Sequence, residues 1–142
     1  MQFCKINLEK TNYKTYANAR FISNDFKSIA QLNIIYYTYC KHKQFESVIP
    51  IFDIEYKEND IIGYYDQSQL VAFSMIGVYD NENIENYQFA WDYVQPKLRL
   101  GINSLKHECA YYKSLGFKNY FLGLYDDYKA QFQGFELLQG CN

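Results

Sequence analysis

The chain of 142 residues is poor in the residues that build metal sites and disulfide frameworks. It has four cysteines and two histidines, and no two cysteines have the Cys-x-x-Cys spacing of a zinc or redox motif. Cys40 and His42 are two residues apart, but nothing near them completes a ligand set, so we expect no metal site. Widely scattered cysteines are typical of reduced thiols, which predicts a cytoplasmic protein. The four are Cys4, Cys40, Cys109 and Cys141.

Long apolar runs and an excess of positive charge are also missing. No apolar stretch approaches the roughly 18–20 residues that span a bilayer, and residues 1–5 lack the layout of a signal peptide. We therefore expect no membrane partner. The formal net charge of −2 argues against the basic field of most nucleic-acid-binding proteins. No Ser-His-acid order, HExxH or GxxxxGKS/T motif occurs, so hydrolase, zinc-protease and P-loop functions have no support.

Aromatic residues, in contrast, are abundant. The chain has 16 tyrosines and 11 phenylalanines, and 49% of its residues are apolar, which is enough to bury a core. The length fits one domain over residues 1–142. Because tyrosine is so common here, no single tyrosine is by itself an indication of function.

The first part of the sequence predicts one strand and one helix. Residues 2–8 read as an opening strand. The N-capping residues Ser23-Asn24-Asp25 then predict a helix that runs to about Lys43. Residues 44–58 stay without an assignment, because Pro50 interrupts an apolar run that would otherwise read as a strand.

The middle of the sequence predicts an antiparallel meander. Residues 61–65 and 70–79 flank the turn residues 66–69, as in a β-hairpin. A second turn at residues 80–83 leads to a third strand at residues 87–94. The β-branched and aromatic residues of these segments suit half-buried strands.

From Gly101 the apolar period becomes helical. A helix is predicted to end just before Gly116, and residues 119–125 form an apolar strand. Strand, helix and strand make a βαβ crossover, so the strands at 87–94 and 119–125 are predicted to be parallel neighbours. The fold class is α+β, with a mixed sheet that combines the meander with a C-terminal βαβ unit and is flanked by helices. The apolar helix positions are Ile102, Leu105, Cys109 and Tyr112.

The turn Pro96-Lys97-Leu98-Arg99-Leu100-Gly101 is a candidate anion site. The first backbone N–H groups of a helix have no partners within it, and the helix dipole adds positive charge, so a phosphate or pyrophosphate binds there readily. Lys97, Arg99 and Lys106 would add mobile charge, and Gly101 would let a ligand approach the backbone. An ordinary strand-to-helix turn explains the same residue types, and both interpretations stay open at this point.

The order of strand, basic turn, amphipathic helix, glycine and buried strand resembles the core of the GNAT superfamily of acyltransferases. Within it, residues 60–138 are most similar to the catalytic half of arginyl- and leucyl-tRNA–protein transferases. The matching positions, in chain order, are Leu98-Arg99-Leu100-Gly101, Leu105, Glu108, Gly116, Tyr120-Phe121-Leu122-Gly123, Tyr128-Lys129-Ala130-Gln131-Phe132 and Glu136-Leu137-Leu138. The chain departs from that branch in lacking its clustered N-terminal cysteines and in having Gly134 where a proline is usual.

The resemblance implies an N-acyltransferase that moves an acyl group, acetyl above all, or an aminoacyl group directly to a primary amine. The donor would be acetyl-coenzyme A or another acyl-coenzyme A, with aminoacyl-tRNA as the alternative that the acidic net charge disfavours. The acceptor would be a small molecule, a protein N-terminus or a lysine. The residues implied in donor binding are Tyr93, Val94, Lys97, Leu98, Arg99, Leu100, Gly101, Ile102 and Lys129.

Three side chains are implied in proton transfer. Asp92 is the candidate base that deprotonates the amine, and Tyr125 or Tyr128 would protonate the leaving group. The carbonyl oxygen would be held by a backbone N–H at Tyr93–Val94. The phosphate turn is degenerate relative to the usual GNAT motif, so a GNAT-fold binding or regulatory module without catalysis is the rival interpretation. Exposed aromatic residues make a homodimer plausible.

Overall fold

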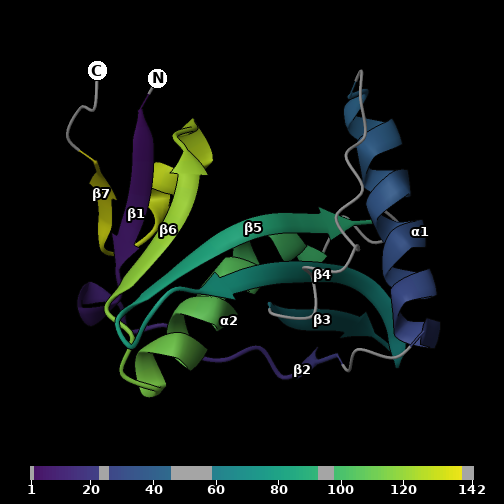
Figure 1. Cartoon of the computed structure of the whole chain (residues 1–142), viewed down its shortest axis with the longest axis horizontal. Coiled ribbons are helices and arrows are strands. Elements are labelled where there is room, and N and C mark those ends of the chain that lie inside the picture. The colour runs from purple at the N-terminus through teal and green to yellow at the C-terminus, as the bar shows by residue number, and fades with distance from the viewer. Residues whose placement is uncertain (1, 23–25, 46–58, 93–97, 139–142) are drawn as a thin grey trace.

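A computed structural model of the chain describes residues 2–22, 26–45, 59–92 and 98–138. One seven-stranded sheet runs through it in the order β2-β3-β4-β5-β6-β1-β7, and only β5 and β6 are parallel neighbours (Figure 1). The strands are β1 (Phe3–Asn7), β2 (Ala19–Phe21), β3 (Asp60–Asp66), β4 (Gln69–Val78), β5 (Asn83–Trp91), β6 (Asn119–Leu124) and β7 (Phe135–Leu137). The helices are α1 (Phe26–Lys43) and α2 (Leu100–Ser114), with short 3-10 turns η1 (Leu8–Lys10) and η4 (Asp127–Gln131).

The predicted meander is confirmed. β3 and β4 are joined by Gln67 and Ser68, both of which have positive φ, of 49° and 71°. Two such residues form a tight turn whose twist matches that of the two strands it joins. β4 pairs with β5 on its other side, and β5 pairs with β6 in parallel as the βαβ pattern predicted.

The predicted start of the third strand is wrong by four residues. β5 begins at Asn83 rather than at residue 87, because the Asp80 side chain closes the turn early. Its carboxylate accepts hydrogen bonds from the backbone N–H groups of Glu82 at 2.8 Å and Asn83 at 2.9 Å. The predicted N-cap at residues 23–25, the unassigned apolar run within residues 46–58 and the predicted strand end at residues 93–94 lie outside the described residues.

Two edge strands were not predicted. β2 and β7 have three residues each, and β1 lies between β6 and β7. Gly134 lets the chain reach β7: its φ is +73°, and its carbonyl accepts the N–H of Asn7 at 2.8 Å. A Cβ built there would lie 2.3 Å from the backbone oxygen of Asn7. The proline of the resembling family, whose φ is fixed near −65°, would not fit this conformation.

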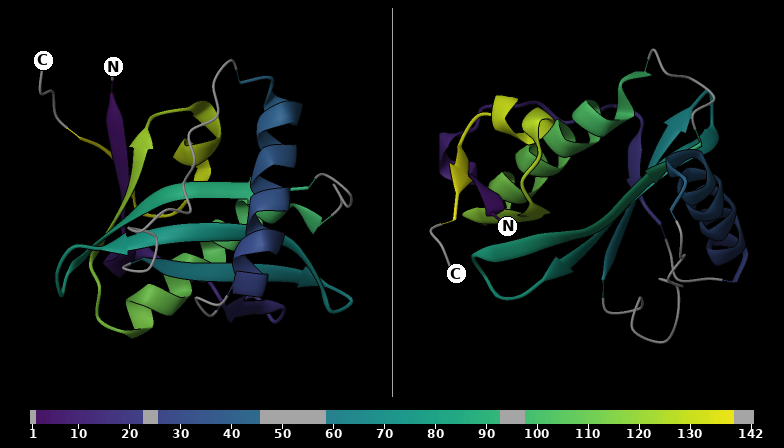
Figure 2. Two further views of the ribbon diagram at one scale, coloured as in Figure 1. Left: turned by 45° about the vertical axis from the view of Figure 1, so that its right-hand side comes forward. Right: turned by 90° about the horizontal axis from the view of Figure 1, so that it is seen from above.

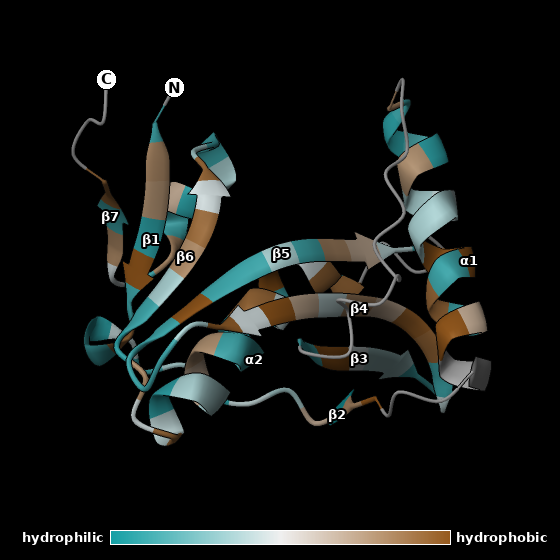
Figure 3. Ribbon diagram, viewed as in Figure 1, coloured by the Kyte–Doolittle hydropathy of each residue, from teal (hydrophilic) through white to brown (hydrophobic). Residues whose placement is uncertain are grey.

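The two helices cover opposite faces of the sheet (Figure 2). α1 buries Leu32, Ile35, Tyr36 and Cys40 against β3, β4 and β5. α2 buries Leu100, Leu105, Cys109 and Tyr112 on the other face, against β3 to β6. β4 is therefore buried on both sides over eight consecutive residues, and hydrophobic residues run along it in Figure 3. A continuous apolar run of this kind is typical of a strand covered on both faces.

Candidate functional site

The parallel pair β5–β6 is joined over only part of its length. Three register pairs hold it together: Asn83 with Asn119, Ile84 with Tyr120, and Glu85 with Phe121. Beyond Glu85, β5 continues to Trp91 and β6 to Leu124, and the two strands separate (Figure 1). This separation opens the centre of the sheet to a ligand.

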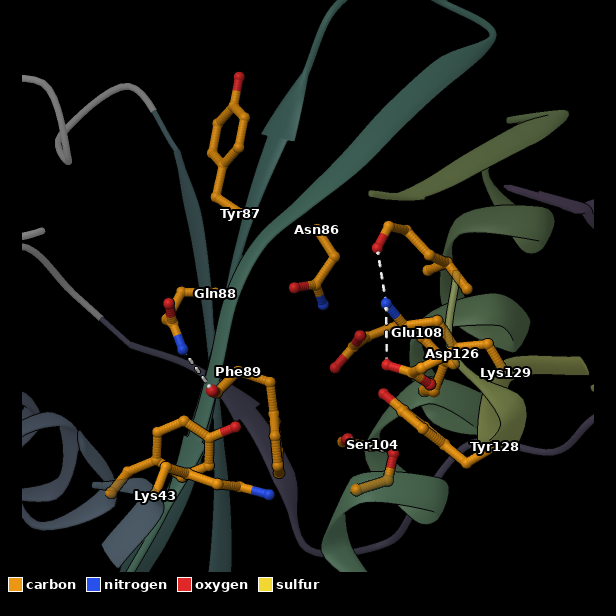
Figure 4. Close-up of a pocket in the computed structure, with 14 residues that line it drawn as sticks. Lys43, Asn86, Tyr87, Gln88, Phe89, Ser104, Glu108, Asp126, Tyr128 and Lys129 are labelled. Atoms are coloured by element: carbon orange, nitrogen blue, oxygen red, sulfur yellow. Dashed lines mark hydrogen bonds and ion pairs between the residues drawn. The ribbon is translucent and has the colours of Figure 1, made fainter. Parts of the chain in front are cut away.

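A cavity of about 400 Å³ lies in this opening. β5 forms one wall, and α2 with η4 forms the opposite wall (Figure 4). Tyr39 and Lys43 reach it from the last turns of α1. The other lining residues are Asn86, Tyr87, Gln88, Phe89, Gly101, Ser104, Leu105, Glu108, Leu122, Asp126, Tyr128 and Lys129.

The first turn of α2 borders the cavity. The helix is preceded by Arg99 in the left-handed conformation, with φ 48°, and the Arg99 carbonyl accepts the N–H groups of Ile102 and Asn103. The N–H groups of Leu100 and Gly101 have no acceptor within the part of the chain that the structure describes. A Cβ built on Gly101 meets no atom within 4 Å. Within the described residues, the turn therefore leaves two backbone donors unpaired at the positive end of the helix dipole, and the space next to Gly101 is open.

Glu108 is the one carboxyl among the buried side chains of the described residues, and its exposed fraction is 0%. Three hydroxyl groups donate to it. Tyr120 bonds Oε1 at 2.5 Å, Ser74 bonds Oε2 at 2.6 Å, and Tyr64 bonds Oε2 as well. Burial raises the pKa of the Glu108 carboxyl, although these hydroxyl groups lower it in part.

The Asn86 amide connects this cluster to the cavity wall. Its Nδ2 donates to the Tyr120 hydroxyl at 2.9 Å, and both Asn86 and Glu108 line the cavity. Asn86 faces Glu108 across the opening in Figure 4.

Tyr128 and Lys129 of η4 form the rim of the cavity next to Asp126 (Figure 4). Lys129 Nζ donates to the carbonyls of Leu124 at 2.7 Å and Leu122 at 3.1 Å, and it lies 3.6 Å from an Asp126 carboxylate oxygen. The lysine thereby fixes the end of β6. The side chain of Tyr128 is half-exposed, but the loss of hydration at its hydroxyl, together with the Asp126 carboxylate, raises the pKa of Tyr128 to about 12.

The structure brings part of the predicted site together. Gly101, Tyr128 and Lys129 line the cavity. Arg99 is exposed beside it, while Leu100 is buried, and Leu98 and Ile102 pack partly buried on the core under α2. Tyr93, Val94 and Lys97 lie outside the described residues.

Two predicted catalytic residues do not line the cavity. Tyr125 is exposed, and its hydroxyl donates to Asp127 at 2.9 Å. Asp92 follows the end of β5, where its backbone N–H donates to the Val71 carbonyl at 3.1 Å. Neither side chain is part of the cavity lining.

Sequence reasoning missed Glu108 as a site residue, although the pattern contained the signal. Glu108 is three residues after Leu105 and four before Tyr112, so it lies on the apolar face of the helix. An acidic residue at such a position is seldom buried without a specific partner. The partners Tyr64 and Ser74 come from strands 34 to 44 residues away in sequence, and helical spacing alone does not reveal them.

Across residues 2–22, 26–45, 59–92 and 98–138, no three His, Cys, Asp or Glu side chains gather closely enough to hold a metal ion. Neither of the two helices described there combines the length and the apolarity needed to cross a bilayer.

Comparison with known proteins identifies the fold. No protein-family model matches the chain, and no curated protein matches its sequence. Among solved structures, the C-terminal domain of a lysylphosphatidylglycerol synthetase from Agrobacterium fabrum is similar, with a TM-score of 0.68 and 10% identity over 87% of this chain and 46% of that one. A GCN5-related N-acetyltransferase from Kribbella flavida has a TM-score of 0.58 and 14% identity over 95% of this chain and 53% of that one.

Saccharomyces cerevisiae N-myristoyltransferase with bound myristoyl-CoA is a third similar structure, with a TM-score of 0.60 and 11% identity over 94% of this chain and 46% of that one. The chain thus spans about half the length of these structures. It has the fold of GNAT acyltransferases, as the sequence predicted. The narrower resemblance to arginyl- and leucyl-tRNA–protein transferases stays a prediction.

Proposed function

We propose that the chain is a cytoplasmic N-acyltransferase that transfers an acyl group from an acyl-coenzyme A donor to a primary amine. The observation that carries this proposal is the cavity between the separated strands β5 and β6, with the first turn of α2 at its edge, in a protein of the GNAT fold. The cavity has room for the reacting ends of a donor and an acceptor.

The donor phosphate would bind at the first turn of α2. The N–H groups of Leu100 and Gly101 and the helix dipole favour an anion there, and the exposed Arg99 side chain starts beside them. From this turn the acyl arm would enter the opening between the strands. The backbone N–H predicted to hold the carbonyl oxygen, at Tyr93–Val94, remains a prediction because it lies outside the described residues.

Tyr128 is the better of the two predicted proton donors, because it lines the cavity and Tyr125 does not. Its raised pKa of about 12 keeps the phenol protonated at neutral pH. In the transfer, the amine nitrogen forms a bond to the acyl carbon and the carbon–sulfur bond of the donor breaks. The thiolate that departs would take the phenolic proton.

The similar structures support two donor classes. N-myristoyltransferase was solved with an acyl-coenzyme A, whereas a lysylphosphatidylglycerol synthetase is named for a product that carries an aminoacyl group. We favour the acyl-coenzyme A, since the net charge of −2 is unfavourable for a large polyanion such as tRNA.

The proposal is tested by calorimetric titration of acetyl-coenzyme A into the wild type and a Gly101→Trp variant. The indole would extend into open space, because a Cβ at this position meets nothing within 4 Å. Leu115→Trp is the matched control: it places the same side chain at the far, exposed end of α2. A donor at 100 times its Kd should also raise the free energy of unfolding by about 2.7 kcal/mol.

We expect acetyl-coenzyme A to bind to the wild type and to Leu115→Trp, and binding to be lost in Gly101→Trp. If only a non-hydrolysable aminoacyl-adenosine analogue binds, the donor is an aminoacyl group. Binding of a donor without any transfer to amines would support a binding module. If neither donor binds, the cavity does not serve acyl transfer and the proposal is wrong.

A further inference from the structure

Within residues 2–22, 26–45, 59–92 and 98–138, the Glu108 carboxyl has no ion-pair partner. The ion pairs formed by the described residues each include a solvent-exposed or half-exposed carboxylate, and none of them includes Glu108. Removing an ionised carboxylate from water without a counter-charge costs free energy. Such a site therefore raises the pKa of the carboxyl and favours its protonated form. A lysine or arginine in contact would instead hold the carboxyl ionised.

The hydroxyl groups around Glu108 can satisfy it in both protonation states, because each hydroxyl either donates or accepts. When the carboxyl is ionised, Tyr64, Ser74 and Tyr120 donate to it. When it is protonated, it can donate to Tyr64, whose hydroxyl then turns its own proton to the Ser104 carbonyl, 3.1 Å away. A proton can therefore enter or leave the carboxyl without leaving a buried polar group unsatisfied.

The position of Glu108 limits where that proton can come from. The side chain has no exposed surface, yet it forms part of the cavity lining two helical turns below Gly101. A proton from a substrate group in the cavity would therefore reach the carboxyl through a hydroxyl group bonded to it, such as that of Tyr120, whose other partner Asn86 lines the cavity. Asn86 stands beside this route and holds Tyr120 in place.

We propose that Glu108 is the general base of the reaction and takes the proton that the acceptor amine must lose before it attacks. This inference rests on the proposed function and replaces Asp92 in the role of the base. In the step, R–NH₃⁺ gives a proton to the Glu108 carboxylate, and R–NH₂ and the carboxylic acid result. The nitrogen then attacks the acyl carbon and the carbon–sulfur bond breaks. Tyr128 protonates the departing thiolate, and its phenolate takes the second proton of the nitrogen, so that an amide and a thiol result. Glu108 returns its proton to solvent after the products leave.

Groups from every neighbouring element affect the titration of Glu108. The charged side chains of Lys43, Asp126 and Lys129 line the same cavity, but no ion pair among the described residues joins them to Glu108. The groups that act on the titration of the carboxyl are themselves uncharged near pH 7. They are Tyr64 of β3, Ser74 of β4, Asn86 of β5, Cys109 and Tyr112 of α2, Tyr120 of β6 and Tyr128 of η4. Burial raises the pKa values of Cys109 and Tyr112.

The test uses Glu108→Gln, which keeps the shape of the side chain, with Asp92→Asn as the matched control. Thiol release from acetyl-coenzyme A is followed with spermidine and with a lysine-bearing peptide as probe amines. We expect Glu108→Gln to lose about 10²- to 10⁴-fold in kcat/KM, with an unchanged Kd for acetyl-coenzyme A. The wild-type rate should fall at acidic pH, because protonation of Glu108 removes the base. This acidic limb of the pH profile should be absent in Glu108→Gln. The Asp92→Asn variant should keep the acidic limb of the wild-type pH profile.

Tyr64→Phe provides a second variant in which the carboxyl remains. Without one of its hydroxyl donors the carboxylate is less stabilised, so the acidic limb should move to higher pH. An unchanged rate and pH profile in Glu108→Gln would overturn the inference. Loss of acetyl-coenzyme A binding in Gly101→Trp, with binding kept in Glu108→Gln, separates the base from the donor site.

A readout without turnover keeps the inference testable if the probe amines do not react. The ¹³C signal of the Glu108 carboxyl, assigned by its absence in Glu108→Gln, is followed against pH in the folded protein. We expect a titration midpoint above the ordinary value of about 4.3 for glutamate. A carboxyl that stays ionised down to acid unfolding, or stays protonated up to pH values of about 10, where lysine amines lose their own protons, cannot act as this base.

Discussion

The two faces of the sheet are built from different kinds of core. On the face that α1 covers, the buried cluster consists of aliphatic, aromatic and sulfur-containing side chains. On the face that α2 covers, a carboxyl and its hydroxyl partners are buried among the apolar residues. The change occurs within one strand: Phe73 of β4 belongs to the α1 side, and its neighbour Ser74 bonds Glu108 on the α2 side.

This difference separates stability from chemistry. An apolar core gains free energy in proportion to the area that it buries, whereas buried polar groups gain little and are costly when one partner is removed. We infer that the α1 face contributes to stability alone, whereas the α2 face has the larger apolar cluster and also holds polar groups. On the α2 face, Glu108 and its hydroxyl partners add less to stability than apolar side chains would, but they place a carboxyl in the cavity wall.

The largest effect is expected from Phe73→Ala on the α1 face. Phe73 is fully buried, so the variant should lose about 3–5 kcal/mol in the free energy of unfolding, through lost burial and the cavity left behind. Denaturant unfolding measures this loss. Ile34→Ala, on the exposed side of α1, is the control and should stay within about 0.5 kcal/mol of the wild type.

For the fraction of Phe73→Ala that remains folded, the Kd for acetyl-coenzyme A should not change. A weaker affinity in the folded fraction would show that the α1 face also shapes the cavity, and the division between the two faces would then fail.

A smaller loss is expected from Tyr120→Phe on the α2 face. The ring stays, but Glu108 loses a hydroxyl donor and Asn86 loses an acceptor. A buried group left without its partner costs about 1–3 kcal/mol, again measured by denaturant unfolding. The same change made in Glu108→Gln gives a double-mutant cycle. If Tyr120 contributes only packing, its substitution costs the same in both backgrounds.

The same contrast explains how much the sequence could predict. The strands at β3, β4 and β6 and both helices follow from local periodicity, and the parallel pairing of β5 with β6 follows from the crossover rule. Gly101 and Tyr128 were found because they flank predicted elements. In contrast, β2 and β7 are three-residue edge strands that exist through their pairing. The Glu108 cluster depends on β3, β4 and β6 converging on one helix face, which no local pattern encodes.

The smallest effect, and the one that compares buried and exposed carboxyls most directly, is a pH dependence of stability. The folded-state pKa of Glu108 is raised by burial, so its contribution is fully present below the unfolded pKa of about 4.3 and is lost as the pH rises through the folded pKa. Relative to Glu108→Gln, the wild type should therefore lose stability as the pH rises above about 4.

Asp80 gives the control of opposite sign. Its fully exposed carboxylate accepts bonds from the Asn83 amide and from the Glu82 N–H, which lower its pKa. Such a group stabilises the fold above its unfolded pKa and loses that contribution as the pH falls. Relative to Asp80→Asn, the wild type should gain stability as the pH rises through about 4. Denaturant unfolding of the three proteins between acidic and neutral pH gives both slopes. Two slopes of the same sign would mean that burial does not raise the pKa of Glu108.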